Sequence, residues 1–336
     1  MAKQILLEHG SGGKLSHELV RDMFLNKFPN PSTVKDTDAA LLDLNQQGVG
    51  FTTDSYVVDP IFFPGGDIGR LAVSGTVNDL LVSGYRPRYL SASFIIEEGF
   101  PMQDLEKIVD SMVEEAKKAG ISIVTGDTKV VDKGKCDKLF INTTGVGEAH
   151  FHLSLPLLPS QLSPGDVILI NGHLGDHGIA VMAAREGLKA NGLVSDVAPL
   201  NDVILPLLDR GIQIKFMRDA TRGGVATVLN EITAGQPFGI IIQEENLPVR
   251  ESVTGMCEML GFDPLYVANE GKVVMVVPAA QAKTALFEIK KSILGENAAI
   301  IGHVTSDHEG MVVLATAIGG TRIVNMLTGR QLPRIC

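Results

Sequence analysis

The printed sequence ends on a cysteine, in the run Pro333-Arg334-Ile335-Cys336. The thiolate is the nucleophile of cysteine chemistry, and the charges around a thiol set how much thiolate is present. The α-carboxylate of Cys336 is expected to raise the pKa of this thiol, whereas the nearby Arg334 is expected to lower it. A cysteine in this position is consistent either with a frayed chain end or with a thiol that an arm of chain carries into a reaction site.

Acidic residues gather in loops beside predicted strands, and this clustering is more informative than any one loop. Asp36 and Asp38 share one loop, and Asp54 closes the run Thr52-Thr53-Asp54 at the end of a predicted strand. Carboxylates in such positions are natural Mg²⁺ ligands, because Mg²⁺ binds one or two carboxylates together with phosphate oxygens and water. A turn-forming role is the alternative for each aspartate taken alone.

A polar pair and a glutamate add to this set. Asn78 and Asp79 lie in a predicted helix rich in small residues. Burying such a pair is costly unless a ligand, a metal or a hydrogen-bond partner satisfies it, so the pair favours a functional site. Glu270 lies in Asn269-Glu270-Gly271, directly before a predicted strand, where a turn and a functional role are equally expected.

Glycines beside charged residues indicate places where an anion could bind. The run Gly10-Ser11-Gly12-Gly13-Lys14 precedes a helix predicted at 15–24, and exposed backbone N–H groups at a helix start suit a phosphate. Its spacing is not that of a Walker A loop, and a flexible turn is an equal alternative. Arg222-Gly223-Gly224 could bind an anion in the same way, although Asp219 could simply cap the helix that follows. Thr125-Gly126-Asp127-Thr128-Lys129 places an acid and a lysine two residues apart at a strand end.

The apolar residues predict alternating strands and helices, which is typical of layered α/β or α+β domains. The clearest helix is 102–119, with apolar residues at helical spacing and Gly120 as its stop. The segment 150–164 is predicted to link two domains, and a mobile tail from residue 327 could extend about 25 Å at roughly 3.5 Å per residue. Strands are predicted at 121–124 (buried), 139–147, 167–170, 212–217, 239–243, 273–277 and 300–304, and further helices at 177–186, 221–232 and 281–293.

Composition fits a globular protein of two domains. The 336 residues are 45% hydrophobic and 20% charged, and such chains divide into domains of about 150 residues. The net charge of -10 argues against nucleic-acid binding, because a polyanion would be repelled. Three cysteines without a Cys-x-x-Cys spacing indicate a reducing compartment without disulfides or a zinc site. No uncharged apolar run reaches the roughly 18 residues of a membrane span, so we expect a cytoplasmic protein.

The order of the motifs resembles that of a known family. From about residue 7 to residue 336 the chain carries His-Gly-Ser-Gly-Gly, Thr-Thr-Asp-Ser, Pro-Gly-Gly-Asp-Ile-Gly, Gly-Thr-Val-Asn-Asp, Thr-Gly-Asp-Thr-Lys, Met-Arg-Asp-Ala-Thr-Arg-Gly-Gly, Asn-Glu-Gly and Pro-Arg-Ile-Cys. In this order they resemble the HypE carbamoyl dehydratases of nickel-iron hydrogenase maturation. The middle motifs are shared with the wider superfamily of aminoimidazole ribonucleotide synthetase and selenophosphate synthetase, where they indicate only ATP use. The cysteine terminus is the element specific to the HypE family.

The resemblance implies a two-domain α/β (α+β) fold of the aminoimidazole ribonucleotide synthetase type. An N-terminal ATP-binding and dimerisation domain (1–155) would form a β-barrel with a second subunit, and a C-terminal α/β sandwich (156–326) would precede a flexible tail (327–336). Tyr85 stands where a small residue is usual, and Asp36-Thr37-Asp38 replaces the usual Asp-Asp pair, so either acid could take the metal. The implied Mg²⁺ ligands are Asp38, Asp79 and Asp219, and the implied ATP contacts are Gly12, Gly13, Lys14, Asp54, Asn78, Gly126, Asp127, Arg222 and Gly223.

The resemblance also implies a reaction on Cys336. A carbamoyltransferase, HypF, would place a carbamoyl group on the thiol, and phosphoryl transfer from ATP would turn the carbamoyl oxygen into a leaving group. Glu270 would act as the base that removes the nitrogen protons and Lys129 as a phosphate or proton partner, leaving a thiocyanate on Cys336. The implied partners are HypF, a HypC–HypD complex and a second copy of the chain.

Three alternatives remain at this stage. A selenophosphate synthetase usually carries a reactive cysteine in the N-terminal glycine loop, where this chain has Ser11. A purine-pathway synthetase needs no terminal cysteine. A non-enzymatic carrier would leave the acids Asp38, Asp79 and Asp219 without a role.

Overall fold

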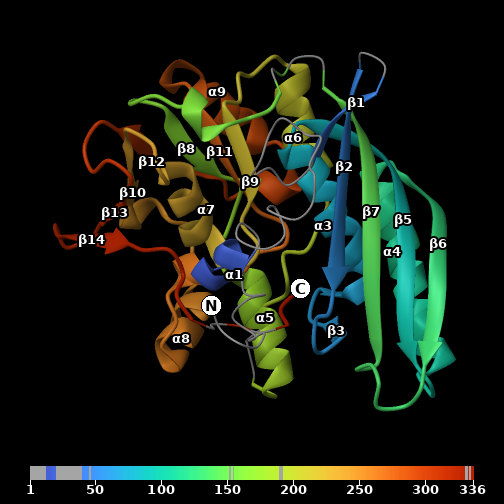
Figure 1. Cartoon of the computed structure of the whole chain (residues 1–336). Helices are drawn as coiled ribbons and strands as arrows, with labels where there is room; N and C mark the ends of the chain where they lie inside the picture. The colour runs from blue at the N-terminus through green and yellow to red at the C-terminus, as the bar shows by residue number, and fades with distance from the viewer. Residues whose placement is uncertain are drawn as a thin grey trace.

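The computed structural model describes residues 13–19, 40–44, 47–150, 153, 155–188, 192–329, 332 and 334–336. Gly12, Asp36 and Asp38, which belong to the predicted nucleotide and metal set, lie outside these residues. Within the described residues, the fold consists of two large β-sheets and one two-stranded sheet, with helices between and around the large sheets (Figure 1). Within the described ranges, no helix is both long and apolar enough to cross a membrane.

The first sheet has five strands in the order β1-β2-β7-β5-β6. Its elements are β1 (Ala40–Leu44), β2 (Gln47–Tyr56), β5 (Tyr85–Glu97), β6 (Ser122–Val131) and β7 (Leu139–Ala149), with the helices α3 (Ile68–Val82) and α4 (Met102–Ala119). Only β5 and β6 are parallel neighbours. Strand side chains alternate between two faces, so Tyr56, Leu90 and Ile141 are buried against the helices, whereas Tyr89 and Ile95 are exposed on the other face.

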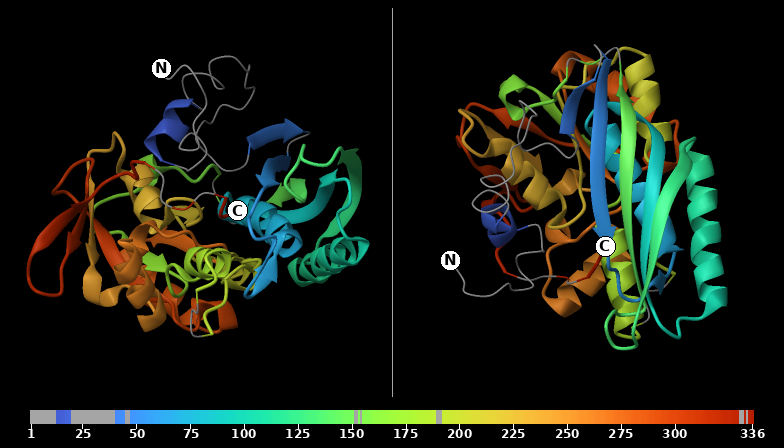
Figure 2. Two further views of the ribbon diagram at one scale, coloured as in Figure 1. Left: turned by 90° about the horizontal axis from the view of Figure 1, so that it is seen from below. Right: turned by 45° about the vertical axis from the view of Figure 1, so that its right-hand side comes forward.

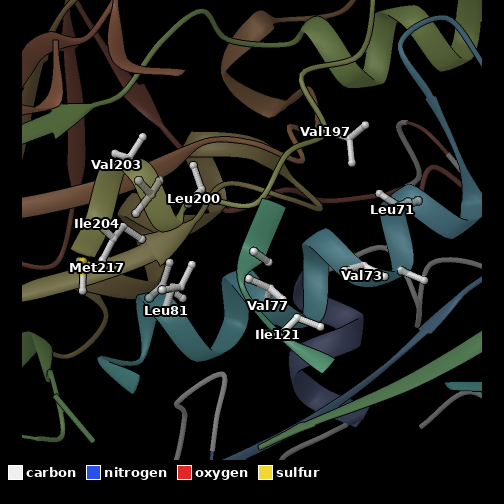
Figure 3. Close-up of a cluster of buried hydrophobic side chains, with 14 of the residues drawn as sticks. Leu71, Val73, Val77, Leu81, Ile121, Val197, Leu200, Val203, Ile204 and Met217 are labelled. Atoms are coloured by element: carbon white, nitrogen blue, oxygen red, sulfur yellow. The ribbon is translucent and has the colours of Figure 1, made fainter. Parts of the chain in front are cut away.

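Helix α3 is almost entirely buried and joins the two halves of the molecule. The Asp67 carboxylate caps its first turn and accepts a hydrogen bond from Gly69 N at 2.7 Å. A Cβ added to Gly69 would lie 2.4 Å from Ile108 O, so the glycine permits close contact between α3 and α4. On the opposite side of α3, Leu81 lies beside Ile204 in the buried cluster shown in Figure 3.

The second sheet has seven strands in the order β14-β13-β10-β12-β8-β11-β9. Its strands are β8 (Val167–Ile170), β9 (Phe216–Asp219), β10 (Gly239–Gln243), β11 (Val273–Val277), β12 (Ala299–Thr305), β13 (Val312–Ala315) and β14 (Thr321–Val324). Helices cover both faces, because Ile168 and Ile170 pack in a core with α7, whereas Leu169 packs in a core with α6 and α9. The remaining elements are α1 (Lys14–Leu19), β3 (Phe62–Phe63), β4 (Gly66–Asp67), α5 (Asp176–Arg185), α6 (Asn201–Asp209), α7 (Gly224–Thr233), α8 (Glu251–Leu260), α9 (Ala279–Ile289) and four 3-10 turns at Pro159–Gln161, Glu244–Asn246, Pro264–Tyr266 and Ile293–Gly295.

Most predicted elements are confirmed. The helix 102–119 and the strands 167–170, 239–243 and 273–277 have the predicted bounds. The strands 139–147 and 300–304 are slightly longer than predicted, and the helices 177–186, 221–232 and 281–293 correspond to α5, α7 and α9 with shifted ends.

Two strand predictions were wrong in part. The strand predicted at 212–217 begins only at Phe216. The strand predicted as buried at 121–124 is the ten-residue β6, and its side chains are almost all exposed, because β6 is the edge of its sheet. The apolar stripe of α4 is also narrower than predicted, since Ile108 and Met112 are buried whereas Val109 and Val113 are exposed.

The C-terminus lies between the two sheets (Figure 2). Residues 334–336 are hydrogen-bonded there, and the side chain of Ile335 is buried. The structure therefore holds the end of the predicted tail in a docked position, and its release from that position stays a prediction.

Candidate active site

A cavity of about 180 Å³ surrounds the end of the chain. Its wall comes from β2, from α3, from the segment that joins β9 to α7, and from the residues before β11. This cavity brings together several predicted site residues from distant parts of the sequence. The lining residues are Thr52, Thr53, Asp54, Gly75, Asp79, Asp219, Thr221, Arg222, Glu270 and Cys336.

Local structure explains how three carboxylates reach this cavity. Thr52 and Asp54 share one face of β2, because strand side chains alternate. Thr52 Oγ1 donates a hydrogen bond to Asp79 Oδ2 of α3 at 3.0 Å. Asp219 is the last residue of β9, opposite Val273 of β11. The acids therefore enter from three elements that only the tertiary fold brings together.

Glu270 is a buried carboxyl group in the same wall. Burial, together with the carboxylates of Asp219 and Asp196, raises the pKa of Glu270 well above its ordinary value, and Arg222 opposes this shift. Within the described part of the chain, Glu270 Oε1 has no hydrogen-bond partner. A buried acceptor without a partner costs about 1–3 kcal/mol, so this oxygen is suited to take a proton or a ligand's hydrogen bond.

The backbone around Glu270 is fixed by two buried side chains. Asp196 accepts hydrogen bonds from Glu270 N at 3.1 Å, Gly271 N at 3.2 Å and Lys272 Nζ at 2.8 Å. Asn78 Nδ2 donates to Glu270 O at 3.3 Å, and its other partners are also backbone groups. Asn78 is thus a positioning residue in this structure, and its contact with phosphates stays a prediction.

The tail docks by pairing its backbone with the chain that follows β2. Val57 N donates to Cys336 O at 3.1 Å, and Asp59 N donates to Arg334 O at 3.2 Å. The side chain of Ile335 fills the core beneath this pairing and is only 3% exposed. The thiol of Cys336 is thereby presented to the cavity of its own chain.

Two side chains of α5 hold the carbonyl groups of the tail. His177 Nε2 lies 2.8 Å from Ile335 O, and His177 Nδ1 lies 2.7 Å from Ser195 Oγ. These contacts define a tautomer in which Nε2–H donates to the carbonyl and Nδ1 accepts from the serine hydroxyl. Arg185 Nη2 donates to Arg334 O at 2.7 Å. His177 therefore has a structural role, which is to dock the tail.

Arg222, and not Arg334 as expected from the sequence, is the arginine that lowers the pKa of the Cys336 thiol. Arg334 forms an ion pair with Asp137 and donates to Val57 O at 2.9 Å. Desolvation raises the pKa of the Cys336 thiol to about 12, and Arg222 is the cation that lowers it in part. Arg222 replaces Arg334 in the predicted electrostatic role, and Arg334 is a docking residue.

The predicted residues of β6 do not enter this cavity within one chain. Strand β6, which carries Gly126, Asp127 and Lys129, is the edge strand of the first sheet on the side away from the second sheet (Figure 1). Lys129 Nζ pairs with Asp127 Oδ2 at 2.5 Å, and both side chains are exposed. A Cβ on Gly126 would lie 2.1 Å from Ala92 O, so this glycine allows β5 and β6 to approach. The roles of these residues in ATP binding and catalysis stay predictions.

The predicted nucleotide contacts Gly13, Lys14 and Gly223 do not line the cavity. Lys14 N donates to Leu327 O at 3.2 Å, and a Cβ on Gly13 would lie 2.6 Å from the same oxygen. Gly223 precedes α7 with a φ of 78°, directly after the cavity residue Arg222. The contacts of Gly13, Lys14 and Gly223 with a nucleotide stay predictions.

The carboxylates of the cavity fit a magnesium ion that arrives with a nucleotide. Among the described residues no group of three His, Cys, Asp or Glu side chains is arranged to hold a metal alone, and Asp38 lies outside these residues. Mg²⁺ needs only one or two protein carboxylates beside phosphate oxygens and water, and Asp54, Asp79 and Asp219 line one cavity. Burial is the largest cause of the raised pKa of Glu270, and the carboxylates of Asp219, Asp196 and Asp54 raise it further. A cation bound here would offset part of that negative charge.

Two family models match the chain in succession. The AIR synthase related protein N-terminal domain matches residues 36–149, and the corresponding C-terminal domain matches residues 163–315. These matches place the protein in the AIR synthase related class and confirm the predicted α/β fold of two AIR synthase related domains, whereas the intersubunit β-barrel stays a prediction.

Full-length relatives narrow this class to one family. Carbamoyl dehydratase HypE of Rhodobacter capsulatus is 46% identical over 338 residues, which cover 99% of this chain and 98% of the relative. A crystal structure of a HypE–HypF complex matches with 50% identity and a TM-score of 0.86, over 92% of this chain and 99% of the matched chain. A crystal structure of HypE in complex with ATP matches with 49% identity and a TM-score of 0.82, over 99% and 100%. The chain belongs to the HypE carbamoyl dehydratase family, as the motifs predict, and the prediction of an enzyme is confirmed.

Proposed function

We propose that this protein converts a carbamoyl group carried on Cys336 into a thiocyanate in an ATP-dependent dehydration, and so supplies cyanide ligands for the iron of a nickel-iron hydrogenase. The observation that carries the proposal is the docked Cys336 in one cavity with Glu270 and the acids Asp54, Asp79 and Asp219. Membership of the carbamoyl dehydratase family supports the reaction type, and a relative crystallised with ATP supports the nucleotide.

Loading of the thiol belongs to the undocked tail. A pKa of about 12 in the docked position leaves very little thiolate near neutral pH, and the thiolate is the attacking species. The carbamoyl group would therefore be received outside the cavity, on a carbamoyltransferase. A relative crystallised in a HypE–HypF complex supports HypF as that partner.

Dehydration then proceeds in two balanced steps. The carbamoyl oxygen attacks the γ-phosphorus of ATP, the bond to ADP breaks, and one nitrogen proton is released. The carbon–oxygen bond then breaks with loss of phosphate, while the second nitrogen proton is removed and the carbon–nitrogen triple bond forms. Such phosphoryl transfer depends mainly on positioning and on neutralisation of charge, and the protein must supply a base for the nitrogen protons.

Glu270 is the residue placed to remove a nitrogen proton. Its Oε1 is buried and has no partner in the described part of the chain, and its raised pKa increases its affinity for a proton. The hydrogen bonds that Asp196 and Asn78 make to its backbone fix its position. Arg222 would neutralise phosphate charge, and Mg²⁺ held by Asp79 and Asp219, with Asp38 as predicted, would add positive charge when bound.

A homodimer would complete this arrangement. The outer face and edge of the first sheet carry large exposed apolar side chains, among them Tyr89, Ile95, Val124 and Val130, and such patches mark interaction surfaces. We place the intersubunit β-barrel of the family there. A second copy on this face would give Lys129 a route to the cavity of its partner, as its predicted role requires. Sedimentation of the chain as a monomer at micromolar concentration would remove this part of the proposal.

The proposal has three further parts. The domains span residues 1–155 and 156–326, followed by the tail 327–336. The protein is cytoplasmic, and it delivers its product to a HypC–HypD complex. The two separate sheets support the division into domains. The selenophosphate synthetase and purine-pathway alternatives lose support, because the full-length relatives are carbamoyl dehydratases.

The direct test is mass spectrometry of the peptide that contains Cys336. Incubation with HypF, carbamoyl phosphate and ATP should add the mass of a cyano group to Cys336, and no cyano group should form when ATP is omitted. Carbamoylation and dehydration can be separated if Cys336 is first loaded with the carbamoyl group and HypF and nucleotide are then removed. A carbamoyl adduct that persists after fresh ATP is added to the purified, loaded protein would refute the proposed dehydration.

A further inference from the structure

A second cavity, of about 570 Å³, lies beside α5 and α8 and shares no lining residue with the catalytic cavity. Its polar wall contains His173, Asp176, Arg250 and Lys272. Its apolar wall is aliphatic and consists of Leu193, Val194, Ile293 and Leu294. The volume lies within the range of roughly 300–1,000 Å³ typical of small-molecule sites, and the division into a polar and an apolar wall predicts an amphipathic ligand.

The charges of the polar wall balance. Arg250 Nε donates to Asp176 Oδ2 at 3.0 Å, and Lys272 Nζ donates to Asp196 Oδ2 at 2.8 Å. Two cations therefore face two carboxylates, and burial keeps His173 neutral by lowering its pKa. A ligand of zero net charge would preserve this balance, whereas a simple anion or a simple cation would upset it.

The polar wall also has hydrogen-bonding capacity that the described part of the chain does not use. Within the described residues, the one hydrogen bond of the Arg250 guanidinium leaves through Nε. The two Nη groups therefore remain available, and they suit a carboxylate because a guanidinium offers two parallel N–H donors. Asp176 is 4% exposed, and its Oδ1 is buried without a partner in the described residues. Rotation about χ2, which is soft for aspartate, turns this oxygen toward a donor in the cavity.

We propose that this cavity is a second ligand site, which binds an aliphatic α-amino acid. The carboxylate of the ligand lies on the Nη groups of Arg250, its ammonium group donates to Asp176, and its side chain contacts Leu193 and Leu294. An α-amino acid fits because Arg250 and Asp176 are directly paired, so the ligand's two charges must also lie close together. The site does not depend on the proposed reaction of Cys336.

The second cavity is linked to the docked tail by one short connection and to Glu270 by another. Ser195 lines the cavity and bonds His177, which holds Ile335 O. Asp196 also lines it and holds Glu270 N. A ligand that contacts this segment is therefore expected to change how tightly the tail docks, and docking is expected to change ligand affinity by the same factor.

Titration of the full-length chain with three isosteric probes tests the site. The probes are L-leucine, 4-methylpentanoate, which lacks the amine, and 3-methylbutylamine, which lacks the carboxylate. Chemical-shift changes should show saturable binding of leucine at least tenfold tighter than binding of either half. Arg250→Gln should weaken leucine binding at least tenfold, and Asp176→Asn should reduce the preference for leucine over 4-methylpentanoate.

Arg210→Gln is the matched control, because Arg210 is also a partly exposed arginine paired with an acid, Glu288, outside the cavity. Leucine affinity should be unchanged in this variant. If Arg250→Gln lowers the melting temperature, Arg250→Lys keeps the charge but loses the parallel donors and should still weaken binding. The proposal is overturned if leucine shows no saturable binding at 10 mM (roughly the weakest affinity worth calling a site), if its two halves bind as well, or if folded Arg250 variants bind leucine normally.

Discussion

Reversal of the charge at Arg334 should make the thiol of Cys336 more reactive. Arg334 is bound to Asp137 and to Val57 O, and its own carbonyl is held by Arg185. Arg334→Glu places two carboxylates against each other and removes the ion pair, so the tail should leave its docked position. If Arg334 instead maintained the thiolate, as the sequence alone predicts, the same substitution would make the thiol less reactive.

The size of the effect follows from the docked thiol. Docking raises the pKa of Cys336 from 9.0 to about 12, and three pKa units correspond to roughly a thousandfold less thiolate near pH 8. The more basic thiolate is intrinsically more nucleophilic, by about twentyfold for a Brønsted slope near 0.45. The undocked thiol should therefore react up to about fiftyfold faster than the docked one.

Alkylation by iodoacetamide at pH 8 (roughly one unit below an ordinary thiol pKa) measures this difference. The label should be quantified on the peptide that contains Cys336, because Cys136 also lies near Arg334. Arg210→Glu is the control, since Arg210 also forms an ion pair, with Glu288 at 2.9 Å, and neither residue lines a cavity that contains tail residues. An alkylation rate of Cys336 that is unchanged or lower in Arg334→Glu would show that the docking contacts do not protect the thiol.

Three further predictions follow from single residues. Glu270→Gln should leave carbamoylation of Cys336 intact and slow cyanation by about 10²–10⁴-fold, as measured by mass spectrometry of the loaded protein; equal cyanation rates would remove Glu270 as the base. Gly223→Ala should lower the free energy of unfolding, measured by chemical denaturation, by more than the roughly 1–2 kcal/mol that a left-handed alanine costs, because its Cβ would lie 2.1 Å from Thr227 Oγ1. Gly235→Ala is the control, because Gly235 has a φ of 68° and open space around it. This control should lose only the free energy of the left-handed conformation, and an equal loss in both variants would contradict the role of the Thr227 contact. Burial lowers the pKa of His177, so the contribution of His177 to stability is complete above about pH 6.5 and declines below that pH. The free energy of unfolding should therefore fall less between pH 7.5 and 5.5 (roughly one unit on either side) in His177→Gln than in the unchanged protein. An equal loss in both proteins would contradict this role.

Elements with a strong local signal could be predicted from the sequence. Helix α4 has the predicted bounds because its apolar stripe and the left-handed Gly120 that ends it are local features. The helices α6 and α8 were not predicted, and each is short and contains a weak helix former, Pro206 or Gly255. The burial of β6 was predicted wrongly because a short apolar run does not reveal whether its strand is central or at an edge.

The candidate site was predictable in its parts but not in its assembly. Asp54, Asp219 and Glu270 attract attention as acids beside strands, yet only the pairing of β9 with β11 and the position of β2 bring them into one cavity. The docking role of His177 has no local signal, because its partner carbonyl on Ile335 is 158 residues away in sequence. Asp196 was missed for the same reason, since it acts on Glu270 from 74 residues away.

The most direct test of the proposed dehydration follows the carbamoyl oxygen. Cys336 should be loaded with a carbamoyl group labelled with oxygen-18, freed of HypF, and then given Mg²⁺ and ATP. Phosphoryl transfer to that oxygen predicts that the label leaves in inorganic phosphate in step with formation of the cyano group on Cys336. Appearance of the label in water, with unlabelled phosphate, would contradict the account.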